Sequence, residues 1–164
     1  MFGLTSLGLV HTAISLVAVA AGFVALWRDG RITPANRLGQ VYIWTTVLTC
    51  LTGFGIFQHG GFGKPHVLGI VTLLVLGVAA IAGRTSWFGR AAPYVETVSY
   101  SATLLFHMIP AVTETTTRLP LGVPLLPSAD APELQTAAAV LFVLFAIGAA
   151  WQAFRLRKAT APAR

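Results

Sequence analysis

Hydrophobic residues are gathered into five long runs, separated by short segments rich in polar residues, glycine and proline. The runs cover residues 6–27, 38–58, 66–83, 93–113 and 131–154. A helix of about 20 apolar residues spans a hydrocarbon core of ~30 Å. No run alternates as a barrel strand would, and in lipid a helix satisfies its own backbone hydrogen bonds. The pattern predicts an all-α polytopic membrane bundle of about five transmembrane helices, forming a single integral membrane domain over residues 1–164.

The segment 114–130, between the fourth and fifth runs, predicts an irregular loop. Pro120, Pro124 and Pro127 stand among leucines there, and proline interrupts a regular helix. We expect this apolar loop to lie as a flap over one mouth of the bundle. The last helix is expected to start at a capping box, with Asp130 as the N-cap and Glu133 three positions later.

The composition supports a lipid environment. Hydrophobic residues make up 55% of the 164 residues and charged residues only 10%, and the mean hydropathy is +0.76. A soluble domain carries about a quarter charged residues, so we expect the bilayer to surround most of this surface. The net charge of +6 does not indicate nucleic-acid binding, because no basic patch with interleaved aromatic residues accompanies it.

The basic residues predict the orientation in the membrane. With the N-terminus outside, nine of the eleven would fall in inner segments: Arg28, Arg31, Arg37, Arg84, Arg90, Arg155, Arg157, Lys158 and Arg164. Only Lys64 and Arg118 would be outside. This positive-inside bias predicts an outer N-terminus and an inner C-terminus. The Ala- and Gly-rich composition is compatible with a bacterial inner membrane.

The four histidines are expected to gather near the outer face. His11 would lie about five residues, or ~8 Å, below the outer end of the first helix, and His107 about six residues below that of the fourth. His59 and His66 flank the short outer loop between the second and third helices. Polar side chains at membrane depth tend to face the bundle interior. We therefore expect the first and fourth helices to turn their histidine faces towards each other.

Neutral imidazole is the commonest protein ligand of transition metals and also binds haem iron. The histidines predict a site for haem b, or for a transition metal ion such as copper or zinc. His11 and His107 would be the main ligands, His66 a third ligand or a neighbouring partner, and His59 a further ligand of a bare ion. No motif of fixed spacing supports the metal, and the histidines could equally tie helices together.

The outer basic residues, Lys64 and Arg118, could meet the propionates of a haem. On the fourth helix, Glu96, Tyr100 and Thr103 share the stripe of His107 and could form a proton path. Alternatively, Glu96 would pair with a nearby arginine.

Three functions remain open at this stage. The first is electron transfer by a small membrane redox protein. The second is a non-catalytic accessory or assembly subunit of a larger membrane complex, or of a homo-oligomer. The third is a small proton channel or transporter. The sequence holds no phosphate-binding loop and no nucleophile elbow, so no enzyme class is predicted.

A family resemblance rests on three segments: Arg37-Leu38-Gly39-Gln40-Val41-Tyr42, Leu51-Thr52-Gly53 and Gly61-Phe62-Gly63-Lys64-Pro65-His66. With these, the chain resembles a family of small bacterial membrane proteins of unknown function, whose members begin one helix with His-Arg-x-x-Gly-x-x-Tyr and the next with Pro-x-His-Leu. The resemblance covers the first four runs, about two thirds of the chain, and matches His11 and His66 to family histidines. Asn36-Arg37 and Gly89-Arg90 stand where the family has inner histidines, so the resemblance argues against an inner site, leaves an outer one open and supplies no activity.

Overall fold

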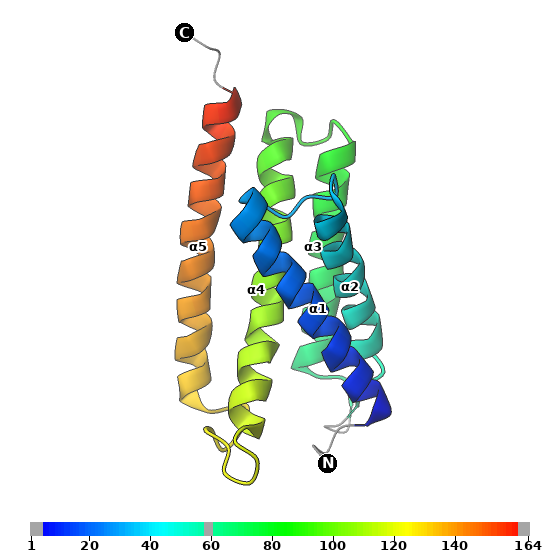
Figure 1. Cartoon of the computed structure of the whole chain (residues 1–164), viewed down its shortest axis with the longest axis vertical. Coiled ribbons are helices and arrows are strands. Elements are labelled where there is room, and N and C mark those ends of the chain that lie inside the picture. Colours follow the sequence, from blue (N-terminus) through cyan, green and yellow to red (C-terminus); the bar gives the residue numbers. More distant parts are fainter. Residues whose placement is uncertain (1–4, 58–60, 161–164) are drawn as a thin grey trace.

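The computed structural model describes residues 5–57 and 61–160, and Figure 1 shows their arrangement. The helices are α1 (Ser6–Asp29), α2 (Arg37–Gly53), α3 (Lys64–Arg84), the short 3-10 helix η1 (Gly89–Ala91), α4 (Ala92–Arg118) and α5 (Pro132–Thr160). These two ranges contain helices and loops but no strand, which confirms the all-α prediction. Three helices, α1, α3 and α5, are long and apolar enough to cross a membrane, which is consistent with an integral membrane protein.

The helices pack chiefly as pairs that follow one another in the chain. α1 packs chiefly on α2, α3 packs on α4, and α5 lies alongside α4 at the edge of the bundle (Figure 1). At the centre, Gly22 of α1 leaves room for the ring of Tyr42 and for Leu104, since a Cβ at Gly22 would lie 2.9 Å from each. Large apolar side chains point outward instead, among them Leu16, Leu74 and Ile147, each more than 60% exposed. Apolar side chains exposed on so many helices favour lipid as the surrounding solvent.

Local chemistry explains where α1 ends and α2 begins. Gly30 follows α1 with a φ of 70°, a left-handed conformation that glycine adopts at low cost, and its N–H donates to the carbonyl of Leu26. Asn36 caps α2 by accepting the N–H of Gly39 at 2.9 Å, and its amide also donates to Asp29 at 2.9 Å. The short connection between the two helices is therefore held by side chains from both.

Several helix ends differ from the sequence prediction, and α5 for example continues to Thr160 instead of ending at residue 154. The second helix was expected to reach residue 58, but α2 ends at Gly53, where Gly53 and Gly55 allow the chain to turn. The fourth was expected to end at residue 113, but α4 continues to Arg118, and Glu114 and Arg118 form an ion pair one turn apart. The predicted loop 114–130 was therefore wrong over its first five residues.

The loop after α4 does not cover the bundle as a flap. Its backbone closes onto the end of its own helix, because Leu126 donates to the carbonyl of Thr116 at 3.0 Å. Leu121, Val123 and Leu125 remain 65–78% exposed, and Figure 1 shows the loop extending beyond the end of α4. The capping box was also wrong: α5 begins at Pro132, and the Asp130 carboxylate accepts from Lys64 at 3.1 Å instead.

Candidate functional site

A set of buried polar side chains joins α2 to α4 in the middle of the bundle. Tyr42 and Thr46 lie one turn apart on α2, and Thr103 and His107 lie one turn apart on α4; we call these four residues the polar ladder. The hydroxyls of Tyr42 and Thr103 are 2.7 Å apart, and Nε2 of His107 is 3.1 Å from the Thr46 hydroxyl. The first three are 0% exposed and His107 is 7% exposed. Buried polar groups are costly unless they are hydrogen-bonded, and these satisfy one another.

The hydroxyl of Thr103 fixes the direction of its hydrogen bond with Tyr42. Thr103 donates its proton to the backbone carbonyl of Tyr100 at 2.7 Å, so its oxygen accepts from Tyr42. Helical threonines commonly donate to a carbonyl of the preceding turn in this way. The ladder therefore ends on backbone at its Thr103 end.

His11 reaches α2 from the other side. Its Nδ1 is 3.1 Å from the hydroxyl of Thr52, and that hydroxyl donates to the carbonyl of Leu48 at 2.8 Å. Nδ1 must then be the donor, which leaves a lone pair on Nε2 of the neutral ring. The ring also lies against Gly53, where a Cβ would come within 3.2 Å of Cε1. The lack of a side chain at Gly53 therefore leaves the space that the His11 ring occupies.

His11 of α1 and His107 of α4, which were expected to face each other, both form their hydrogen bonds with α2. α1 packs mainly on α2 and meets α4 at few points. Thr46 and Thr52 are six residues apart, which places them on different faces of α2 and ~9 Å apart along its axis. The rings of His11 and His107 are nevertheless close enough to interact electrostatically.

His66 forms a separate site at the start of α3. Its ring lies between Phe57 and Phe62, with centroids 5.0 and 5.1 Å away, and its Nδ1 accepts the N–H of Gly63 at 3.2 Å. His59 lies outside the described residues. Over residues 5–57 and 61–160, no group of three or more His, Cys, Asp and Glu side chains could hold a metal ion.

The residues of the predicted proton path lie in sequence order along α4. Tyr100 and Thr103 are buried, and the Glu96 carboxylate lies against Gly83 of α3, where a Cβ would be 2.6 Å from Oε1. The proton of Thr103 points to the carbonyl of Tyr100 and not to its phenol. The hydrogen-bonded chain of the polar ladder thus ends at the backbone carbonyl of Tyr100 and does not extend to Glu96.

Sequence reasoning missed the α2 side of this site. Tyr42, Thr46 and Thr52 were not candidates, although threonines recur at helical spacing along that run. It also missed Gln152 of α5, which is buried and joins three elements. Gln152 accepts from Ser101 of α4 at 3.0 Å and donates to the carbonyl of Gly30 at 2.9 Å.

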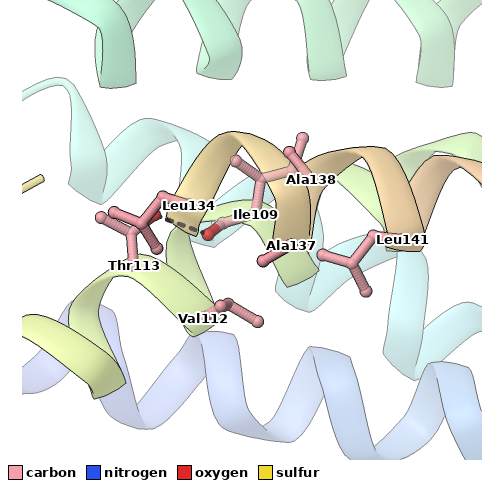
Figure 2. A pocket seen from close by; sticks show the side chains of 7 residues that line it. All are labelled: Ile109, Val112, Thr113, Leu134, Ala137, Ala138 and Leu141. Atoms are coloured by element: carbon pink, nitrogen blue, oxygen red, sulfur yellow. Dashed lines mark hydrogen bonds between the residues drawn. The ribbon is translucent and has the colours of Figure 1, made fainter. Parts of the chain in front are cut away.

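A cleft between α4 and α5, drawn in Figure 2, has no histidine among its lining residues. Aliphatic side chains of both helices line it, including Ile109, Val112, Leu134 and Leu141. Its one marked hydrogen bond runs from the hydroxyl of Thr113 to the carbonyl of Ile109, within α4 itself. Without a free polar group, the cleft offers apolar contact only.

Comparisons with models of known families, with curated proteins and with solved structures found no match to this chain. The family resemblance described above therefore stays a prediction. The function is therefore inferred from the geometry of the histidines and the polar ladder.

Proposed function

We propose that the protein is a small integral membrane electron-transfer protein, in which His11 and His107 hold an iron centre in the outer half of the bundle. One observation carries the proposal. Each imidazole spends one ring nitrogen on a threonine of α2, Nδ1 of His11 on Thr52 and Nε2 of His107 on Thr46. Histidines that bind metals are commonly oriented in this way by a hydrogen bond to their other nitrogen.

The donor set fits haem b better than a bare ion. Copper and zinc sites need three or four protein ligands, and the described part of the chain holds no such cluster. A haem iron takes four nitrogens from its porphyrin, so two imidazoles complete it. His66 does not fit as a third ligand, because its Nδ1 accepts from Gly63 and its Nε2 then carries the proton.

The chain's own residues would orient and insulate this centre. Thr52 fixes the tautomer of His11, so that the lone pair of Nε2 is the one offered. Thr46 fixes the ring of His107, and Tyr42 packs edge-on against it, with centroids 6.3 Å apart. When bound, haem supplies reversible one-electron chemistry.

The experiment is haem titration of the purified full chain and of its variants in detergent. His11→Ala and His107→Ala should each abolish stoichiometric binding, whereas His66→Ala should leave it intact. Thr52→Val should weaken binding about 10-fold, because it removes the group that orients His11. Equal binding by wild type and both ligand variants would overturn the proposal.

A second candidate is a non-catalytic accessory or assembly subunit of a larger membrane complex or homo-oligomer. What favours it is that the same imidazoles already join helices, as Gln152 joins α1, α4 and α5. Under this reading, His107→Asn would keep the fold and assembly, and no haem would bind. The titration above therefore separates the two.

We also propose that all five helices cross the membrane, including α2 and α4. Their lower hydropathy follows from the polar side chains that they turn towards each other, Thr46 and His107 among them. The proposed orientation places the N-terminus outside and the C-terminus inside a bacterial inner membrane. Near the C-terminal end of α5, Arg155 lies over the ring of Trp151 at 4.8 Å and Lys158 over Phe154 at 4.7 Å. Such aromatic and basic pairs are typical of a membrane interface.

A further inference from the structure

His66 carries a buried donor for which the described part of the chain supplies no acceptor. Its Nδ1 accepts the backbone N–H of Gly63, so the neutral ring bears its proton on Nε2. That nitrogen is buried without a hydrogen-bond partner, in a side chain that is 6% exposed. Buried donors in native proteins are nearly always satisfied, so an unpaired one indicates a missing acceptor.

The surroundings of this donor can open from outside. Phe57 and Phe62 lie nearly parallel to the imidazole, at interplanar angles of 27° and 30°. They are themselves 58% and 67% exposed. A Cβ on neighbouring Gly61 would meet nothing within 4 Å. A ligand that displaces one of these exposed phenylalanines would therefore reach the imidazole ring from outside.

The chemistry of the site favours a neutral acceptor with a flat ring. Lys64, two residues before His66, forms an ion pair with Asp130 at 3.1 Å, so the basic residue next to His66 in sequence already has an anionic partner. The exposed phenylalanine faces suit stacking with another ring. In the proposed membrane placement of α3, on which this inference rests, the ligand must also dissolve in the bilayer.

We propose that His66 donates its Nε2–H to a carbonyl oxygen of a lipid-soluble quinone, whose ring stacks on Phe57 or Phe62. This binding site is distinct from the His11–His107 pair and does not require it. The ester carbonyl of a phospholipid offers the same acceptor without the ring.

The test is equilibrium binding of a short-tailed benzoquinone to the full chain in nanodiscs, with the infrared carbonyl stretch of the bound quinone as a second readout. Wild type should bind and shift one carbonyl band to lower frequency. His66→Leu should lose that shift and about five- to tenfold in affinity, the worth of one hydrogen bond. Phe62→Leu should weaken binding but keep the shift, whereas Phe142→Leu, an exposed aromatic of α5, should change neither.

Three results would overturn the proposal. The first is an absence of quinone binding by wild type. The second is binding that His66→Leu leaves unchanged while circular dichroism shows the variant folded; should it not fold, His66→Asn and Phe62→Leu supply the comparison. The third is thermal stabilisation that depends on His66 in ester-linked but not ether-linked lipid nanodiscs, with no effect of quinone, which would assign the donor to a lipid. Loss of haem binding in His11→Ala with quinone binding retained would separate this site from the proposed iron site.

Discussion

At the scale of single residues, threonine determines how the buried histidines are held. Thr52 and Thr46 of α2 each bind one imidazole from a neighbouring helix. Other threonines, such as Thr72 of α3, donate only within their own helix, to the carbonyl of Leu68. The same residue type therefore serves two purposes, and only the contacts distinguish them.

This distinction gives a stability prediction. Thr46→Val and Thr52→Val should each lower the free energy of unfolding by about 0.6–1.7 kcal/mol, the range for interhelical hydrogen bonds in membranes. Thr72→Val should cost less, because its hydroxyl bonds only its own backbone. Thermal unfolding in one detergent measures all three. Equal losses in all three variants would mean that the hydrogen bonds from Thr46 and Thr52 to the histidines add no stability.

At the scale of helices, the glycines that are needed for stability are those that other backbone atoms approach closely. A Cβ on Gly39 would lie 1.8 Å from the carbonyl oxygen of Thr33, whereas one on Gly77 of α3 would meet nothing within 4 Å. Gly39→Ala should therefore destabilise the protein by about 1–3 kcal/mol. Gly77→Ala should be neutral or stabilising by up to about 1 kcal/mol. Chemical denaturation of the pair checks this, and the reverse order would contradict the packing of the α1–α2 connection.

The attachment of α5 depends on Gln152. Gln152→Leu would leave the Ser101 hydroxyl and the Gly30 carbonyl without their partner, at a cost of about 1–3 kcal/mol. Gln135→Leu, on an exposed position of the same helix, is the matched control. Limited proteolysis should cut the connection before α5 faster in the first variant only. If both variants are cut alike, Gln152 does not hold α5.

The sequence was sufficient to predict which segments form helices, but not which helices pack against each other. The long hydrophobic runs located all five long helices, and three of these are long and apolar enough to cross a membrane. The predicted end of α4 was too early. The prolines at 120–127 suggested a loop from residue 114, but Glu114–Arg118 remain helical. The contact of His11 with α2 was not predictable, because helical periodicity defines a face but not which neighbour lies against it. The contact needs Gly53, because a side chain at that position would crowd the His11 ring.

At the scale of the whole molecule, the proposed orientation can be checked directly. In a Cys50→Ala background, a cysteine at Ser128, before α5, should react with an impermeant maleimide added to intact cells. A cysteine at Ser86, between α3 and α4, should react only after the membrane is opened. The prediction follows from the distribution of basic residues. The opposite pattern would invert the topology and place the histidines near the inner face.

The central claim is that this bundle holds an iron centre between histidines of α1 and α4. The most direct measurement is the absorption spectrum of the detergent-purified protein before and after dithionite, with metal analysis of the same sample. If the protein binds haem as proposed, the spectrum will show a reducible Soret and α-band at about one haem per chain, lost in His11→Ala. Copper or zinc without those bands would contradict the haem while keeping the imidazole site. A folded, colourless and metal-free sample that stays empty after incubation with haem would contradict the iron centre and favour the accessory subunit.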